Sequence, residues 1–311
     1  MIRDFTRKLR ASLSYFFNEY ETHHGYKELK VVKEIIDRAK KIKFSNKDKL
    51  TTHQLFSKKI LDIIKEKKLL NFLQNGFIQQ MFFIHNRIFI LFELLELKRD
   101  KKWIYWKRLI KENQIGNPVK YFLYPKSSGN KIHQVYHLKK YNDFSKINFK
   151  QFKTVIEFGG GYGNMAYIFN KINPQIKYII FDTYEVNLLQ YYYLKKCNLD
   201  VGIGINNSNK IKLIDNLDDL KKIVKKTKKS NKNLFIANWS FSEISLNLRK
   251  KLFFIFEKYP YQIFSFQKNF ENINNYNYFK KVNLNNNKRK LNSEIFKMNS
   301  KRNNFYLFCL K

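Results

Sequence analysis

The segment Lys-Thr-Val-Ile-Glu-Phe-Gly-Gly-Gly-Tyr-Gly at positions 153–163 decides the fold of this chain. A short apolar run leads to an acid at Glu157, and a helix-like stretch begins near Asn164. A strand, a glycine loop and a helix in this order let the backbone approach a ligand closely, with free N–H groups and the helix N-terminus directed at it. The glycines of the predicted loop are Gly159, Gly160, Gly161 and Gly163.

A second apolar run, Tyr178-Ile-Ile-Phe181, ends at Asp182. An acid at the end of the second strand is where a nucleotide-type ligand presents its ribose hydroxyls. The glycine loop and Asp182 together predict that the chain binds an adenosine-containing cofactor.

The glycine spacing separates two classes of cofactor. The dinucleotide pattern Gly-x-Gly-x-x-Gly, started at Gly159, would need its third glycine at position 164, where Asn164 stands. An NAD-binding oxidoreductase is therefore disfavoured. The chain has Glu-x-Gly-x-Gly-x-Gly from Glu157 to Gly163, which resembles motif I of class I S-adenosylmethionine (SAM)-dependent methyltransferases. The glycine loop can also be a turn in an unrelated α/β protein.

Three further segments carry a closer resemblance. They are Gly116-Asn-Pro118, Asp182-Thr-Tyr-Glu185 with the Leu- and Tyr-rich stretch after it, and Asn238-Trp-Ser-Phe-Ser-Glu-Ile244. From about residue 70 onward the chain resembles the sugar O-methyltransferase family of bacterial polysaccharide loci. Relatives often have Leu-Pro where Thr183-Tyr184 stand here, a departure that leaves Asp182 in register. The resemblance implies a Rossmann-like methyltransferase domain, SAM as methyl donor, and a sugar or glycan-linked hydroxyl as acceptor.

The resemblance and the motif together predict the SAM contacts. We expect Asp182 to bind the ribose diol and Glu157 to orient the methionine amino group, directly or through water. Asn238 is expected to contribute contacts near the sulfonium. We expect Gly159, Gly161 and Gly163 to let the backbone approach SAM closely, and Gly160 lies in the same loop.

A sugar hydroxyl is a poor nucleophile, so its methylation needs a general base or a metal. Glu243, five residues beyond the predicted fourth strand, is one candidate base. Its Ser-x-x-Glu spacing from Ser240 is also that of a helix capping box. His133 and His137 are the other candidates, because residues at i and i+4 share one helix face and imidazole titrates near neutrality. The absence of a neighbouring acid in the His-Glu-x-x-His manner argues against a metal, and most isolated histidines are structural.

The predicted fold class is α/β. Residues 1–145 are expected to form a helical region on the acceptor side, and 146–311 a Rossmann-like, mostly parallel sheet that binds SAM. The apolar stretch 77–97 contains Gln79, Gln80, His85, Arg87, Glu93 and Glu96, and such polar groups favour a buried helix over a membrane span. A helix is also expected over 132–141, with polar loops at 124–130 and 272–290 and a solvated basic run at 221–233. Strands are predicted near 153–158, 177–182, 200–205, 233–238 and 261–266, with a terminal hairpin at 293–299 and 304–310.

The formal charge of +36 keeps other functions open. Such a field attracts nucleic acid at low salt, so a nucleic-acid methyltransferase is one alternative. Only ten of the 61 basic residues are arginine, however, and Asn238 is not followed by the Pro-Pro-aromatic motif of amino-methylating enzymes. A SAM-fold interaction protein without catalysis is the second alternative. The excess of lysine is accompanied by abundant Asn, Ile, Tyr and Phe. These residue types have AT-rich codons, so an AT-rich coding sequence would also produce this composition.

The two cysteines form neither a disulfide framework nor a metal-ligand spacing. The first residues lack the apolar core of a signal peptide. A cytoplasmic protein is therefore expected.

Overall fold

The computed structural model describes residues 26–42, 52–66, 68–82, 87–230, 232–299 and 303–311. Its chain divides into two compact units. The helical unit comprises the described part of Met1–His137 together with Thr183–Leu199, and the sheet unit comprises Leu138–Asp182 and Asp200–Lys311. The division of the chain into domains at residue 145 stays a prediction.

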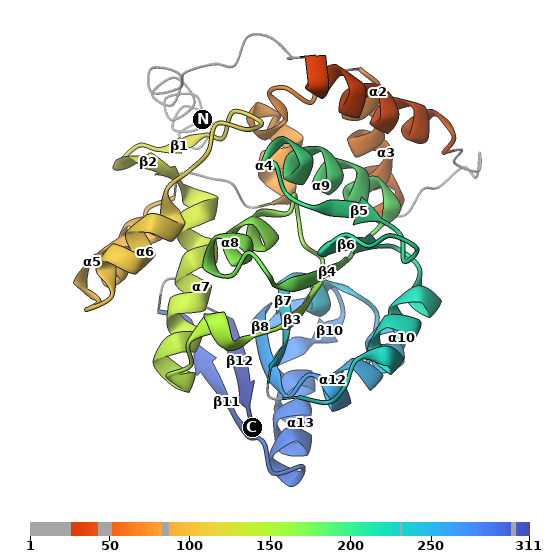
Figure 1. Cartoon of the computed structure of the whole chain (residues 1–311). Helices are drawn as coiled ribbons and strands as arrows, with labels where there is room; N and C mark the ends of the chain where they lie inside the picture. The colour runs from red at the N-terminus through yellow and green to blue at the C-terminus, as the bar shows by residue number, and fades with distance from the viewer. Residues whose placement is uncertain (1–25, 43–51, 67, 83–86, 231, 300–302) are drawn as a thin grey trace. The chain divides into compact units, whose positions relative to one another are not determined.

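The helical unit contains most of the elements before residue 138 and one later helix, α9 (Figure 1). Phe72 packs edge-on against two tyrosines of α9, with ring centroids 6.1 and 6.4 Å from Tyr192 and Tyr193. The bounds are α2 (Tyr26–Lys40), α3 (Thr52–Lys65), η1 (Phe72–Gln74), α4 (Gly76–Met81), α5 (Phe89–Arg99), α6 (Trp103–Ile110), β1 (Lys120–Tyr121), β2 (Tyr124–Ser128), α7 (Gly129–Ser145, whose last turns belong to the sheet unit) and α9 (Tyr184–Lys196).

Two expectations for this unit were wrong. The apolar stretch 77–97 holds two helices, α4 and α5, rather than one, since α4 ends at Met81. The segment 124–130 is not a loop, because β2 pairs antiparallel with β1 and α7 begins at Gly129. The burial of Ser127 and Ser128 explains the difference: these polar residues lie inside the unit instead of facing water. The helix expected over 132–141 is confirmed within α7.

The sheet unit contains an eight-stranded sheet in the order β11-β12-β8-β7-β3-β4-β6-β5. Its six strands from β8 to β5 are parallel, and β12 and β11 complete one edge as an antiparallel hairpin. The predicted α/β, Rossmann-like fold with a mostly parallel sheet, a terminal hairpin and a helical N-terminal region is thereby confirmed. The strands of this sheet are β3 (Thr154–Phe158), β4 (Lys177–Phe181), β5 (Val201–Ile203), β6 (Ile211–Ile214), β7 (Asn233–Asn238), β8 (Tyr261–Gln267), β11 (Asn292–Lys297) and β12 (Asn304–Leu310). Two further strands, β9 (Asn269–Phe270) and β10 (Ile273–Asn274), pair antiparallel with each other.

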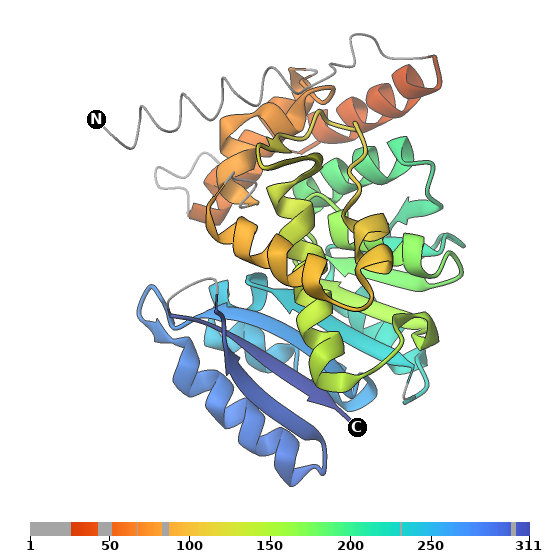
Figure 2. The same cartoon turned by 90° about the vertical axis from the view of Figure 1, so that its left-hand side faces the viewer.

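Helices cover the sheet, and α13 lies along the terminal hairpin (Figure 2). A cluster of buried aromatic side chains fills the space under it, with Phe266 and Phe279 stacked at 4.1 Å. The helices and turns of the unit are η2 (Phe149–Gln151), α8 (Asn164–Ile172), α10 (Leu217–Lys226), η3 (Ser240–Glu243), α11 (Leu246–Lys251), α12 (Phe254–Lys258) and α13 (Asn275–Lys288).

Helix α13 overturns the loop expected over 272–290. Its N-cap is Asn274, whose side chain accepts a hydrogen bond from the backbone N–H of Asn277. Phe279 and Val282 are buried against the sheet, so tertiary packing outweighs the low helix propensity of its many asparagines. Strand β6 was not predicted. None of the described helices is long and apolar enough to cross a membrane.

Candidate functional site

The glycine loop connects β3 to α8 with three residues in the left-handed region. Their φ angles are +70° at Gly159, +58° at Gly161 and +96° at Gly163. Gly163 is the N-cap of α8, and its N–H donates to the carbonyl oxygen of Gly160 at 3.0 Å. Residues with a Cβ rarely adopt these φ angles, so the loop needs glycine at these three positions. The predicted strand, loop and helix are confirmed.

Two glycines of the loop are also required by their neighbours. A Cβ on Gly159 would lie 2.3 Å from Cβ of Ser240, and one on Gly160 would lie 2.6 Å from Cγ2 of Ile180. The Ser240 hydroxyl donates to the carbonyl oxygen of Phe158 at the end of β3. The absence of side chains therefore lets the loop pack against the segment after β7 and against β4, in addition to any approach to a ligand.

Glu157 is a buried carboxylic acid at the end of β3. It is 3% exposed, and its Oε2 accepts a hydrogen bond of 2.9 Å from the Tyr178 hydroxyl on β4. Burial raises the pKa of Glu157 to about 8; the hydrogen bond from Tyr178 opposes this rise, and the charge of Asp182 adds to it. The side chain is therefore largely protonated at neutral pH. Its predicted contact with the methionine amino group stays a prediction.

Asp182 lies beside the glycine loop. The N–H of Gly159 donates to the carbonyl oxygen of Phe181 at 2.9 Å, which joins the first residue of the loop to the residue before Asp182. The N–H of Asp182 in turn donates to the carbonyl oxygen of Ile214 on β6 at 3.0 Å. The Asp182 side chain is half-buried, and these two backbone hydrogen bonds fix the main chain around it at the carboxyl end of β4.

Asn238 and Trp239 follow at the end of β7. The Asn238 Oδ1 accepts a hydrogen bond of 2.6 Å from the Ser265 hydroxyl, while its buried Nδ2 has no hydrogen-bond partner among the described residues. Trp239 has φ +72° and ψ −49°, a conformation that is strained for a residue with a side chain. An amide donor without an acceptor and a strained backbone thus occur side by side at the carboxyl end of the sheet.

Glu243 ends the short helix η3. Its Oε1 accepts a hydrogen bond of 3.4 Å from Nε2 of Gln267. The capping-box interpretation is wrong, because the Ser240 hydroxyl bonds the carbonyl oxygen of Phe158 and no side chain caps η3. The helix that follows, α11, is capped instead by Ser245, which accepts from the N–H of Leu248.

A buried arginine supports this segment. Arg249 donates to the carbonyl oxygens of Ser242 at 2.8 Å and Ile244 at 3.0 Å, and the Asn275 side chain donates to Ser242 as well, at 3.1 Å. The guanidinium lies 4.6 Å from the ring centroid of Tyr278. These contacts hold the backbone on either side of Glu243, and no local sequence pattern indicates them.

His133 and His137 lie in the helical unit on α7. His133 Nδ1 lies 2.8 Å from the carboxylate of Glu93 on α5, and both side chains are buried. The rings of the two histidines lie 4.2 Å apart, as the i and i+4 spacing predicts. Sequence reasoning missed Glu93, although a carboxylate within an apolar stretch is itself a signal that a partner exists. The residues that the structure describes hold no group of three or more His, Cys, Asp or Glu side chains able to bind a metal.

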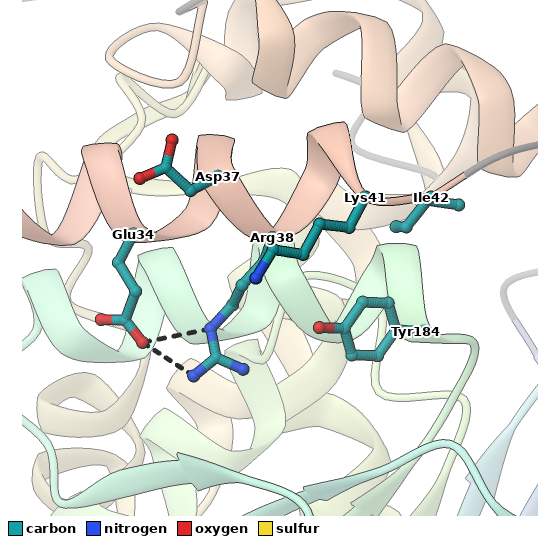
Figure 3. Close-up of a pocket in the computed structure, with 6 residues that line it drawn as sticks. All are labelled: Glu34, Asp37, Arg38, Lys41, Ile42 and Tyr184. Atoms are coloured by element: carbon teal, nitrogen blue, oxygen red, sulfur yellow. Dashed lines mark hydrogen bonds and ion pairs between the residues drawn. The ribbon is translucent and has the colours of Figure 1, made fainter.

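The helical unit also has a pocket of about 630 Å³ between α2 and the start of α9 (Figure 3). Nε and Nη2 of Arg38 donate to Oε1 of Glu34 at 3.2 and 2.9 Å, and Tyr184 forms a further hydrogen bond with Arg38. Asp37 and Lys41 also line the pocket. Its acidic and basic groups balance each other, so its charge selects neither anions nor cations.

No protein-family model matches the chain, and no curated protein matches it. Solved structures are similar over part of its length. Precorrin-6y C5,15-methyltransferase from Geobacter metallireducens is 8% identical and matches 56% of this chain and 86% of its own, with a TM-score of 0.38. A SAM-dependent methyltransferase from Aquifex aeolicus is 13% identical and matches 56% and 88%, with a TM-score of 0.37. Mitomycin 7-O-methyltransferase is 8% identical and matches 71% and 72%, with a TM-score of 0.35. At such values the substrates of these proteins say nothing about the substrate of this chain.

Proposed function

We propose that the chain is a SAM-dependent O-methyltransferase whose acceptor is a hydroxyl of a sugar or a polysaccharide precursor. The observation that carries the proposal is the hydrogen bond between Gly159 and Phe181, which sets a left-handed glycine loop directly beside Asp182. When bound, SAM supplies a methyl group on a sulfonium, an excellent leaving group. Positioning of the acceptor therefore provides much of the rate acceleration.

The residues at the carboxyl end of the sheet fit this cofactor. The half-buried Asp182 would accept hydrogen bonds from a ribose diol, and the glycine loop beside it would let the backbone approach the ligand closely. The buried Nδ2 of Asn238, which lacks a partner among the residues described, would donate to a ligand oxygen. A ligand ammonium near Glu157 would favour its charged form and lower its pKa from about 8.

The acceptor hydroxyl must lose a proton as the new bond forms, which requires a general base. Glu243 is one proposed base, because Gln267 and the supports around Ser242 hold its segment in place. His133 and His137 are also proposed, and the Glu93 carboxylate would orient the His133 ring in the way that a carboxylate orients a catalytic imidazole. The sugar specificity rests on the sequence resemblance alone.

Thermal unfolding with SAM, with its demethylated product and with NAD at matched concentrations tests the cofactor. A ligand at about a hundred times its dissociation constant adds about 2.7 kcal/mol, which raises the midpoint by roughly 5 °C or more. We expect the rise with SAM and not with NAD, and its loss in Asp182→Ala. Asp218→Ala is the matched control, because Asp218 is an exposed acid in the first turn of α10. No rise with SAM would refute the proposal.

Transfer of labelled methyl to a panel of free and nucleotide-linked sugars tests the acceptor. Glu243→Gln should keep the thermal shift with SAM while slowing transfer on the order of a hundredfold or more if Glu243 is the base. His133→Gln and His137→Gln provide the same test for the histidines. Transfer to RNA or DNA instead of sugars would favour the nucleic-acid alternative, which the charge of +36 supports. Binding of SAM without transfer to any acceptor would favour the non-catalytic alternative.

A further inference from the structure

The helical unit has a second pocket, of about 540 Å³, whose lining is strongly basic. Four lysines line it, together with a single carboxylate and an aromatic ring. These residues are Lys107, Lys111, Lys120, Lys126, Glu112 and Tyr124.

Three separate elements bring the lysines together. Lys107 lies in the last turn of α6 and Lys111 is the C-cap of that helix. Lys120 lies on β1 and Lys126 on β2, which pair as an antiparallel hairpin. The N–H of Glu112 donates to the carbonyl oxygen of Lys126 at 3.1 Å, which joins the end of α6 to the hairpin. The pocket is therefore built by tertiary structure and is not a run of lysines along one helix.

The carboxylate of Glu112 does not neutralise the pocket. Its Oε1 lies 2.7 Å from Nζ of Lys131, and the two side chains are 2% and 0% exposed. The Ser128 hydroxyl donates a hydrogen bond of 2.5 Å to its other oxygen. A further ammonium group, that of Lys98, lies 5.4 Å from the ring centroid of Tyr124. Because Glu112 is engaged by a lysine outside the lining, the lining keeps an excess of positive charge.

One of the lysines that line the pocket, Lys120, is buried in the protein. The residue is 6% exposed, and its Nζ donates to Oε1 of Gln114 at 2.9 Å. Neighbouring like charges repel each other, more strongly where burial lowers the local dielectric constant. An anion in the pocket would offset this repulsion.

We propose that this pocket binds the diphosphate group of a small molecule, such as a nucleoside diphosphate sugar. Lysine ammonium groups act as point charges that suit phosphate oxygens, and several of them match more than one phosphate. The volume leaves space for an organic group beside the phosphates, for which Tyr124 and Pro125 offer apolar surface. The pocket lined by Glu34 and Arg38 has no comparable excess of either charge. Binding here does not depend on methyl transfer, although a nucleotide-linked sugar would be an acceptor of the proposed class.

Calorimetric titration of the full chain with inorganic pyrophosphate and with UDP-glucose, at 50 and 200 mM salt, tests the proposal. We expect both probes to bind and to compete with each other, more weakly at the higher salt because exposed charges are screened. Lys107→Gln combined with Lys126→Gln should weaken binding about tenfold or more. Both lysines are exposed, so the fold should survive, and thermal unfolding checks that it does. The control combines Lys58→Gln with Lys101→Gln, which removes the same charge from exposed positions outside the pocket and should change binding less than about twofold.

Several results would overturn the proposal. If the pocket and control variants lost equal affinity for the probes, the net charge of the protein alone would explain the binding. If neither pyrophosphate nor UDP-glucose bound, the pocket would not be a diphosphate site. Titrations with single-stranded RNA and with phosphatidylglycerol vesicles distinguish other phosphate sources. If either bound through Lys107 and Lys126 while pyrophosphate did not, the pocket would belong to a nucleic-acid or membrane surface. Because no probe contains SAM, failure here and failure of the SAM thermal shift are separate results.

Discussion

The Tyr178 hydroxyl donates a 2.9 Å hydrogen bond to Glu157 across two adjacent parallel strands, and both groups are buried. The acid of the glycine motif is thus held by its neighbour on β4 in addition to any ligand. Because burial raises the pKa of Glu157 to about 8, the pair makes the stability of the sheet unit depend on pH.

The first prediction concerns Glu157→Gln. The folded-state pKa of about 8 exceeds the unfolded value of about 4.5, so the folded chain holds this proton more tightly. The wild-type free energy of unfolding should therefore fall as the pH rises from 4.5 to about 8, by roughly 2 kcal/mol or more. Glu157→Gln should lack this fall. Denaturant unfolding at pH 5, 7 and 9 measures it, and equal pH dependence of the two proteins would contradict the assignment.

Tyr178→Phe provides a second measurement on the same pair. The hydrogen bond from Tyr178 favours the charged form of Glu157, so its removal should raise the pKa of Glu157 further. The pH range over which stability falls should then extend to higher values. An unchanged profile in Tyr178→Phe would mean that the hydroxyl does not influence the carboxyl group.

The second prediction concerns the contact between Gly159 and Ser240. Gly159→Ala adds a Cβ 2.3 Å from Cβ of Ser240 at a φ of +70°, and should destabilise the fold by about 2–4 kcal/mol. Gly204→Ala is the matched control: its φ is +85° and no atom of the described residues lies within 4 Å of the new Cβ, so it should cost only about 1 kcal/mol. In a Ser240→Gly background, Gly159→Ala should lose its excess cost. If Gly159→Ala destabilised the wild-type and Ser240→Gly proteins equally, the contact with Ser240 would not be the cause of the destabilisation.

The third prediction concerns the buried pair of Glu93 and His133. Removing one partner leaves a buried polar group without its bond, so Glu93→Ala should cost about 3–5 kcal/mol. A double-mutant cycle with His133→Ala should give a coupling of about 1–3 kcal/mol. The pair of Lys139 and Asp143, also on α7 but more exposed, should couple by less than about 1 kcal/mol. Similar couplings for the two pairs would argue against a special role for Glu93.

The fourth prediction concerns Arg249. Arg249→Met removes two hydrogen bonds to the backbone of the segment that carries Glu243, and should destabilise the fold by about 2–4 kcal/mol. It should also slow methyl transfer, because the segment would lose its support. Lys250→Met, at an exposed position on the same helix, should change neither property. Normal transfer by folded Arg249→Met would show that the support is not needed.

Sequence patterns predicted the parts of the fold in which local signals and tertiary packing agree. The run at 233–238 matches β7 residue for residue, and the glycine loop lies where its spacing placed it. Strand β6 was missed because four residues with one lysine give little alternation. Helix α13 was missed because its asparagines favour loops until Phe279 and Val282 are buried.

The candidate site, too, could be predicted from the sequence only in part. Asp182 and Asn238 lie at the ends of strands that the sequence indicates, so their positions at the carboxyl end of one parallel sheet follow from topology. The pairs formed by Glu93 with His133 and by Tyr178 with Glu157 join residues 40 and 21 positions apart, and no local pattern marks such partners. The strained Trp239 had no signal in the sequence, because it depends on how β7 leaves the sheet.

The position of Trp239 has an optical consequence. The chain has three tryptophans, and Trp239 is the only one in the sheet unit, directly after Asn238. With Trp103 and Trp106 replaced by phenylalanine, all remaining indole emission would come from this one strained residue. Its intrinsic fluorescence would then provide a label-free signal for changes next to Asn238 at the carboxyl end of the sheet.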